Sequence, residues 1–308
     1  MMKLNYILKI SGISTALFLA GCSSNSNTPA QPSEPTNSVM AVNPTAVYSK
    51  PRTLDNFNDY VNFLKAKASA EGVSADVLNA QNNINYIQKS ADLDDRQAGR
   101  IRKRDPNVPP IINPNGMTNY LNRVLTKNKV DTAEARYWEQ LPQLENASKK
   151  FGVPKNYLLA LWGMESSFGY YQGNYDVLST LATLAFDGRR EALFSKEFIA
   201  AMKMLQRDHI QRHKMLGSWA GAMGQTQFMP SSYLSYAADG NNDGEKNIWT
   251  NHYDVFASIA NYLHTVGWNE NLPWGVEVAL TQPLDMALAG TEDNKNALYA
   301  TGKIWASP

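Results

Sequence analysis

Residues 158–169 read Leu-Leu-Ala-Leu-Trp-Gly-Met-Glu-Ser-Ser-Phe-Gly, which is typical of an apolar helix that ends at a glycine. Leu158, Leu161 and Glu165 recur at helical spacing, so a carboxylate shares the apolar face with leucines. Loss of water and the partial negative charge of the helix C-terminus would both raise the pKa of this carboxyl. A raised pKa is what a general acid needs at neutral pH. The alternative is a frayed helix end with Glu165 in solvent.

The sequence on either side of this stretch predicts a mainly α body. Pro154 stands where the first turn of the Glu165 helix would begin, and folded sequence is expected from about Leu54. Asp131 and Glu134 resemble a capping box, and Val276–Leu280 is the best strand candidate. Helical patterns are predicted over 54–72, 74–89, 131–152, 177–185, 189–214 and 254–265, with a proline-rich loop or extended crossing at 100–115.

The N-terminus predicts a lipid anchor. A basic start, a short apolar run and the residues Leu19-Ala20-Gly21-Cys22 are typical of a cleaved signal peptide over residues 1–21. Leu-Ala-Gly-Cys resembles the bacterial lipobox, which implies acylation of Cys22 and, with Ser23 next, the periplasmic face of the outer membrane. Residues 22–53 are rich in Ser, Asn, Thr and Pro and are expected to be a flexible tether. The alternative is an ordinary secretory peptide with an incidental cysteine.

Composition excludes several other classes of protein. Cys22 is the only cysteine of the 308 residues, which excludes an intramolecular disulfide and a cysteine-rich metal site. The net charge of +1 gives no reason to expect nucleic-acid binding. His209 and His213 have the i, i+4 spacing of a zinc pair, but no Glu lies between them as in an HExxH motif. A surface helix face is the expected reading of this pair.

A second stretch, residues 217–233, reads Gly-Ser-Trp-Ala-Gly-Ala-Met-Gly-Gln-Thr-Gln-Phe-Met-Pro-Ser-Ser-Tyr. Glycines let backbone approach a ligand, and the amide side chains supply hydrogen bonds, so the stretch could form the wall of a groove. A structural turn with core packing is the alternative on composition alone.

Together the two stretches resemble the lytic murein transglycosylase B family, and the resemblance runs from about Leu54 to Val278. It implies a mainly α fold with a lysozyme-like catalytic core, an additional helical subdomain and a small, shortened C-terminal β-containing part. The implied boundaries are a catalytic region over 54–308, with the helical subdomain at about 54–130 plus 175–215, the core at about 131–174 plus 216–266, and the tail at 267–308.

The resemblance also implies the site. The catalytic glutamate of the family falls on Glu165, and no cofactor is expected for catalysis. Residues that hold glycan or peptide would be Ser218, Gln227, Tyr262 and, less directly, Tyr120, with Arg189 and Arg190 as a basic pair facing peptide carboxylates. On sequence alone the arginine pair would be a solvated helix start.

Neither of the two stretches contains a carboxylate besides Glu165, and this absence indicates the mechanism. Hydrolases of this class use two carboxylates, whereas the nearest candidates here, Asp176 and Asp187, look like helix N-caps. The resemblance implies a lytic transglycosylase, for which one glutamate suffices: it acts first as acid and then as base on the bond between N-acetylmuramic acid and N-acetylglucosamine. The cleavage consumes no water and leaves a 1,6-anhydro end. A muramidase that hydrolyses the same bond is one alternative. A degenerate peptidoglycan-binding lipoprotein is another, because the chain stops at Pro308 where family members continue with a cleft-completing segment.

The residues Asp239-Gly240-Asn241-Asn242-Asp243-Gly244 match the first half of an EF-hand loop. The sequence places oxygen donors at Asp239, Asn241, Asp243 and Glu245, and the resemblance implies that Asp254 closes the site. A structural Ca²⁺ is therefore expected, with a metal-free Asn/Asp/Gly turn as the alternative. The expected partners are peptidoglycan glycan strands and, through the anchor, a membrane; a cell-wall remodelling complex is a further candidate.

Overall fold

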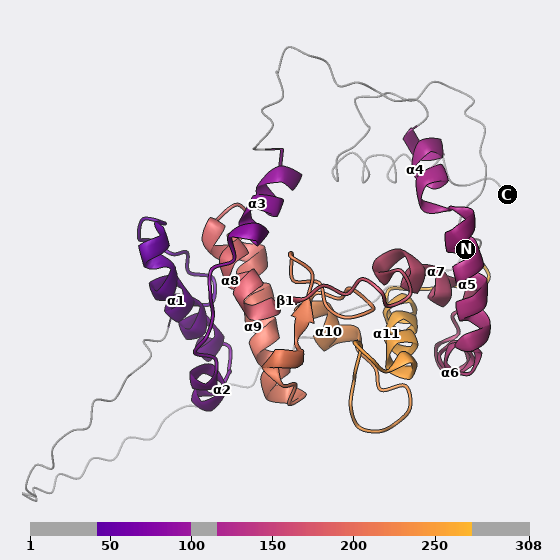
Figure 1. The fold of residues 1–308 in the computed structure, drawn as a ribbon. Helices are drawn as coiled ribbons and strands as arrows, with labels where there is room; N and C mark the ends of the chain where they lie inside the picture. Colours follow the sequence, from indigo (N-terminus) through magenta and orange to yellow (C-terminus); the bar gives the residue numbers. More distant parts are fainter. Residues whose placement is uncertain (1–41, 100–115, 273–308) are drawn as a thin grey trace, which may run out of the picture. The chain divides into compact units, whose positions relative to one another are not determined.

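The computed structural model describes residues 42–99 and 116–272 (Figure 1). The described part is mainly helical, as the sequence predicts. Its elements are, in chain order, η1 (Leu54–Asn56), α1 (Phe57–Ala70), α2 (Ala75–Ala80), α3 (Gln88–Gln97), α4 (Gly116–Val124), α5 (Lys127–Glu139), α6 (Leu141–Phe151), α7 (Lys155–Ser166), β1 (Tyr175–Asp176), α8 (Val177–Asp187), α9 (Glu191–Arg207), η2 (Arg212–Lys214), β2 (Leu216–Gly217), α10 (Pro230–Tyr236) and α11 (His252–Thr265).

Helix α8 forms the centre of the first hydrophobic cluster. Every residue from Val177 to Phe186 is buried, because α8 is apolar or small on all sides and packs against α1, α3 and α9. Ser179 and Thr183 accept backbone N–H groups of Asn85 and Ile87 at 3.1 and 2.9 Å, which fixes the extended segment between α2 and α3 on α8. The cluster also includes four residues of the segment expected to belong to the lysozyme-like core, namely Met223, Tyr233, Ala237 and Ile248.

A second hydrophobic cluster joins α6, α7 and α11. Trp162 of α7 is 1% exposed, and its ring meets the ring of Phe256 of α11 edge-on at 5.1 Å. Leu144 of α6 and Leu158 of α7 are fully buried in the same cluster. This packing holds α7, the helix that carries Glu165, along one whole side.

Extended backbone is short and lies beside the second motif. β1 pairs antiparallel with β2, with Tyr175 opposite Gly217, and bridges then link Gly217 to Met223 and Met223 to Phe228. The sequence analysis did not predict these pairings, because two-residue strands leave no period-2 pattern. The predicted strand Val276–Leu280 lies outside the described residues.

Three predicted helices have different bounds in the structure. The capping box at Asp131 is wrong: α5 begins at Lys127, and the Thr126 side chain accepts the Lys129 N–H as its cap. The helix predicted to run to Gly152 is broken at Gln140, because Pro142 cannot donate to a preceding turn and lies instead in the first turn of α6. Gly152 does end α6, with φ of 70°.

The other two differences are at 74–89 and 189–214. Helix stops at Ala80 in the first segment, and the chain then runs extended to α3. In the second, α9 ends at Arg207 and His209 takes a left-handed φ of 50°, so His213 lies in η2 and not on the same helix. The prediction that His209 and His213 share a surface helix face is therefore wrong.

The folded part begins before Leu54. Tyr48 packs edge-on against Tyr60 at 5.1 Å, and Lys67 donates to the carbonyl of Ala46 at 2.9 Å. Arg52 donates to the carbonyl of Phe186 and pairs with Glu191. An aromatic ring and a paired arginine thus order the end of the segment expected to be a tether. The signal peptide, Cys22 and the start of the tether lie outside the described residues.

None of the helices in the described ranges is long and apolar enough to cross a membrane. The predicted loop at 100–115 and the tail from 273 lie outside those ranges.

Candidate active site

Glu165 lies in the last turn of α7. Pro154 is the N-cap of this helix, so it lies one residue before the first turn in which the sequence predicts it. Leu158 and Trp162, which precede Glu165 in the helix, are buried, and Leu161 is half-buried. Glu165 itself is at an accessible position at the edge of this apolar face. Desolvation by the surrounding protein nevertheless raises the pKa of its carboxyl above the usual glutamate value. This is the direction that a general acid requires.

A tight turn follows Glu165 directly. Ser167, Phe168 and Gly169 all have left-handed φ values, of 49°, 60° and 83°, and two of these residues carry side chains. Such residues are strained unless their surroundings hold them. Here the N–H of Phe168 reaches the Trp162 carbonyl at 3.3 Å, and the two rings meet edge-on at 5.4 Å. The Ser166 hydroxyl accepts the Gly169 N–H at 3.0 Å. These contacts with α7 hold the turn in its strained conformation.

The second motif, which the sequence predicts to be the wall of a groove and which is called the wall below, begins with a compact turn. Ser218 accepts the N–H groups of Ala220 and Ala222 at 3.3 and 3.1 Å, which closes a compact turn. Gln227 has φ of 50°, and its amide N–H groups donate to the carbonyls of Gln172 and Gly224 at 3.2 and 2.9 Å. Its side-chain carbonyl oxygen accepts no hydrogen bond from the described part of the chain, so it could accept one from a ligand.

Backbone contact brings the two motifs together at Gly173. A Cβ on Gly173 would lie 2.1 Å from the carbonyl oxygen of Gly217, so only glycine allows the chain after Glu165 to approach the wall this closely. The hydrogen bond from Gln227 to the carbonyl of Gln172 closes the same junction.

Gln225 of the second motif forms hydrogen bonds to α7 and to residues 248 and 249. Its Oε1 accepts the indole N–H of Trp162 at 2.7 Å, and its Nε2 donates to the carbonyl of Trp249 at 2.8 Å. Its backbone N–H donates to the carbonyl of Ile248 at 2.9 Å. Gly169 makes room for this side chain, since a Cβ there would lie 2.5 Å from Oε1. Sequence reasoning missed this residue, because its pattern does not distinguish Gln225 from Gln227.

Arg189 and Arg190 are engaged by a residue that the sequence did not connect with them. Asp94 of α3 is almost fully buried; Arg189 Nε donates to its carboxylate at 2.7 Å, and Arg190 Nη2 does so at 2.5 Å. Burial of Asp94 opposes its charge, but the hydrogen bonds and charges of the two arginines outweigh burial and lower its pKa. The structure therefore places the pair in an ion cluster between α3 and the start of α9.

The two tyrosines predicted to line the site lie in different places. Tyr262 of α11 is 38% exposed, and its ring packs against Phe228 of the wall at 6.0 Å and Tyr236 at 5.1 Å. Tyr262 is thus brought to the second motif. Tyr120 lies exposed on α4 with the Arg123 guanidinium 5.7 Å over its ring, and we find no contact of Tyr120 with the Glu165 turn among the described residues.

The loop at 239–249 has the donors expected for Ca²⁺ but is held by its own hydrogen bonds. Asp239 accepts the N–H groups of Asn242 and Gly244 at 2.6 and 2.8 Å. Asp243 accepts the N–H of Glu245 and the amide of Asn241, both at 2.8 Å, and these bonds lower its pKa.

Asp254 closes this loop from α11. It is fully buried and accepts the N–H groups of Gly240 and Asn247 at 2.8 and 2.7 Å. Burial raises the pKa of Asp254, and the negative charges of Asp243 and Asp239 add to the effect. The donor chemistry fits Ca²⁺. In the described ranges, however, no three His, Cys, Asp or Glu side chains converge as a metal would require.

The two aspartates considered as second carboxylates lie at the two ends of α8. Asp176 is an N-cap as predicted: it accepts the Ser179 N–H at 2.8 Å and forms an ion pair with Arg212 at 3.0 Å. Asp187 is not an N-cap, because it is the last residue of α8, before the left-handed Gly188.

Comparison with known proteins adds three relatives. The chain is 36% identical over 164 residues to "Membrane-bound lytic murein transglycosylase B" of Escherichia coli, an alignment that covers 52% of this chain and 45% of that protein. The structure is similar to that of SltB3 from Pseudomonas aeruginosa in complex with NAG-anhNAM-pentapeptide, with a TM-score of 0.64, 34% identity, and coverage of 76% of this chain and 59% of that one. It is also similar to Escherichia coli Slt35 in complex with calcium, with a TM-score of 0.58, 27% identity, and coverage of 68% and 64%.

The chain therefore spans less than two thirds of the length of each of these relatives. The family model for the transglycosylase SLT domain matches residues 56–307, most of the sequence, and takes in both motifs. On this match, and on the fold that it shares with SltB3, the chain belongs to the transglycosylase SLT domain family.

Proposed function

We propose that this protein is a peptidoglycan lytic transglycosylase that cleaves the bond between N-acetylmuramic acid and N-acetylglucosamine without water. The observation that carries the proposal is Glu165, an accessible carboxyl of raised pKa on a helix fixed against the glycine-rich wall. Asp176 and Asp187, the other carboxylates considered, are built into the ends of α8. A single acid/base residue therefore accounts for the site better than a pair.

The proposed reaction uses one proton twice. Protonated Glu165 donates to the glycosidic oxygen as the bond to C1 of the muramyl residue breaks, and the N-acetylglucosamine side leaves as an alcohol. The Glu165 carboxylate then accepts the proton of the muramyl 6-hydroxyl, whose oxygen bonds to C1. The product carries a 1,6-anhydro end, and Glu165 is protonated again.

The solved relatives support this choice of substrate. SltB3 has been crystallised with NAG-NAM-pentapeptide and with NAG-anhNAM-pentapeptide, a pair that differs in the anhydro end. In this chain we propose that Ser218, Gln227 and Tyr262 contact the glycan. Their support is that Ser218 and Gln227 lie in the second motif, which meets the chain after Glu165 at Gly173, and that the Tyr262 ring packs against Phe228 of the same motif.

The test compares the Ser23–Pro308 protein with its Glu165→Gln variant on purified peptidoglycan. The parent is expected to release muropeptides lighter by one water than reducing-end products, and the variant to lose at least about 100-fold in rate because general acid–base catalysis is removed. Mass spectrometry of the released products distinguishes the outcomes. Reducing ends would show a muramidase, and binding without release would show a degenerate binder.

Lipid anchoring through Cys22 is a separate proposal. Its support is the lipobox-like sequence and the membrane-bound description of the Escherichia coli relative. Expressed with labelled palmitate, the full chain is expected to take up label and to sediment with outer membranes, and Cys22→Ala to do neither. Label on the Cys22→Ala protein would contradict the proposal.

We also propose a structural Ca²⁺ in the loop from Asp239 to Asp254. The oxygen donors of the loop and the calcium in the related Slt35 structure support it. Calorimetric titration with Ca²⁺ is expected to give heat with the parent and none with Asp243→Ala. A parent that gives no heat contradicts the proposal.

A further inference from the structure

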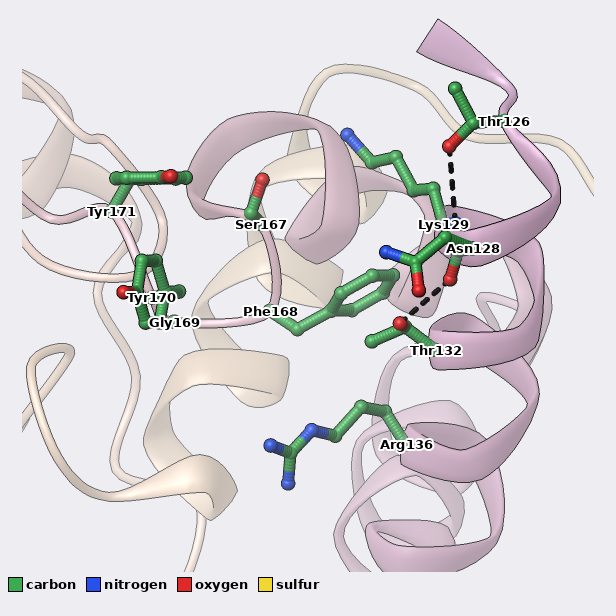
Figure 2. Close-up of a pocket in the computed structure, with 10 residues that line it drawn as sticks. All are labelled: Thr126, Asn128, Lys129, Thr132, Arg136, Ser167, Phe168, Gly169, Tyr170 and Tyr171. Atoms are coloured by element: carbon green, nitrogen blue, oxygen red, sulfur yellow. Dashed lines mark hydrogen bonds between the residues drawn. The ribbon is translucent and has the colours of Figure 1, made fainter.

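Figure 2 shows a cavity between α5 and the turn that follows Glu165, which adjoins the proposed catalytic site. A second cavity, of about 600 Å³, has a different lining. It is lined by residues 208–211 at the end of α9, by Lys214 of η2 and by residues 245–247 of the loop that precedes α11. Glu165 and the residues proposed to contact the glycan do not line this second cavity.

Part of the second cavity is apolar and is fixed by its own hydrogen bonds. The indole N–H of Trp249 donates to the carbonyl of Leu216 at 2.9 Å, and the hydroxyl of Tyr233 donates to the carbonyl of Lys246 at 2.8 Å. The rings of Tyr233 and Trp249 lie 6.0 Å apart. Because these polar groups already have partners, the half-buried side chains of Ile210, Leu216 and Trp249 offer apolar surface to a ligand.

The charged groups of the lining leave an excess of one positive charge. Asp208 is neutralised by the Arg207 guanidinium, which lies 2.7 Å from its carboxylate. Across the described ranges, Lys214, Lys246 and Glu245 form no ion pair. Two ammonium groups against one carboxylate would attract a ligand that carries a single negative charge.

His209 has an unusual backbone conformation where it lines this cavity. Its φ of 50° lies in the left-handed region that favours glycine. Residues in such conformations gather at binding and active sites, where the surrounding structure holds them. The His209 side chain is exposed, so its imidazole N–H can donate to an anionic group in the cavity.

We propose that the second cavity binds a small organic anion with one carboxylate or sulfonate on an aromatic or alicyclic body. Lys214, Lys246 and His209 meet the negative group, and the body lies against Trp249 and Leu216. The site is independent of the proposed function, because it includes no proposed glycan contact.

The occupant would also touch the chain that follows Glu165. Gln172 and Gly173 line the second cavity, and the carbonyl of Gln172 accepts the Gln227 amide at the junction with the wall. The cavity thus places its ligand against a segment that connects the two motifs.

The test compares two probes, anilinonaphthalene sulfonate and phenylnaphthylamine, which is the same ring system without the sulfonate. Fluorescence titrations of the Ser23–Pro308 protein are made in EDTA, so that Ca²⁺ in the neighbouring loop does not contribute. Lys214→Gln together with Lys246→Gln is expected to weaken sulfonate binding about tenfold, because charge-assisted hydrogen bonds are lost, and to leave the neutral probe unchanged. Lys149→Gln with Lys196→Gln, two exposed lysines outside the cavity, is the matched control.

A single thiol locates the bound probe. Because Cys22 is the only cysteine of the chain, Gln211→Cys in the Ser23–Pro308 protein carries one thiol, on the lining of the cavity. With the sulfonate at about ten times its Kd, reaction of this thiol with a maleimide is expected to slow about tenfold, since about one chain in eleven remains free. Gln97→Cys, at an exposed position on α3, is expected to react at an unchanged rate.

Equal weakening by the control pair, or equal weakening of the neutral probe, would show that the two cavity lysines do not recognise the anion and would overturn the proposal. Protection of both thiols, or of neither, would overturn it as well. Neither readout uses release of muropeptides, so failure of the proposed function leaves this result standing.

Discussion

At the residue scale, Glu165 combines access to substrate with a shifted proton affinity. Its position at the edge of the apolar face of α7 leaves the carboxyl reachable, while desolvation raises its pKa. The two properties oppose each other elsewhere on a surface, where a reachable carboxyl is a hydrated one. Here they coexist because the surrounding protein removes part of the water around the carboxyl without covering it.

Activity should fall as pH rises through the raised pKa of Glu165. The first step needs the protonated form, so the descending limb of the rate against pH is expected above the ordinary glutamate value of about 4.3. Initial release of anhydro muropeptides, measured across pH with the same folded protein, gives this limb. A limb at the ordinary glutamate value would contradict the assignment.

The same shift predicts a cost in stability. A carboxyl whose pKa is higher in the folded than in the unfolded state stabilises the fold at low pH, and that contribution is lost as pH rises through the folded pKa. Glu165→Gln should therefore unfold at a higher temperature than the parent at pH 7, with a smaller difference in acid. Thermal unfolding at the two pH values checks this. A variant less stable at pH 7 would argue against desolvation.

Gln225 is predicted to position the Glu165 turn. Gln225→Ala leaves the indole N–H of Trp162 and the carbonyl of Trp249 unpaired in a buried place, at a cost of about 2–3 kcal/mol. We expect kcat to fall more than KM changes, because the glycan contacts proposed for Gln227 remain. Gln97→Ala, an exposed glutamine on α3, is the control. An unchanged kcat in the folded variant would reduce Gln225 to a stability role.

At the element scale, the ion cluster at Asp94 fastens α3 to the start of α9. Asp94→Asn removes one charge from between two arginines, and because the arginines are about a third exposed we expect a loss of about 2 kcal/mol in the free energy of unfolding. Urea unfolding measures it, with Asp92→Asn on the same helix as control. An equal loss in the control would count against the cluster.

The lowered pKa of Asp94 also sets the pH range of this effect. Its stabilisation is present above the unfolded pKa of an aspartate and is lost as pH falls through the lower folded value. The difference between parent and Asp94→Asn should therefore shrink in acid. A difference that does not change with pH would show packing, and not charge, to be the cause.

At the scale of the whole molecule, the two hydrophobic clusters are linked by hydrogen bonds at the site itself. The second motif contributes Met223 to the cluster around α8, while its Gln225 binds Trp162 in the cluster around α7. Opening of the junction would separate the wall from the acid. Stability and activity are thus expected to depend on the same contacts.

Residues 42–53 belong to this molecule-wide packing. A protein that begins at Leu54 loses the Tyr48 contact with Tyr60 and the Arg52 bonds to α8 and Glu191, about 2–3 kcal/mol in all. Its melting temperature is expected about 5–10 °C below that of a protein beginning at residue 42. Calorimetry of the two decides it. Equal melting temperatures would show that folded sequence does start near Leu54.

The sequence by itself determined the mainly helical character and the two motifs, because apolar periodicity, Gly152 at a helix end and a lone glutamate in α7 are local signals. It could not show which distant groups meet. Asp94 accepts Arg189 and Arg190 across about a hundred residues of chain, and Gln225 reaches Trp162 across 63. A buried ion or amide takes whichever partner packing brings within hydrogen-bond distance, so only the tertiary structure decided those pairings and the lining of the second cavity.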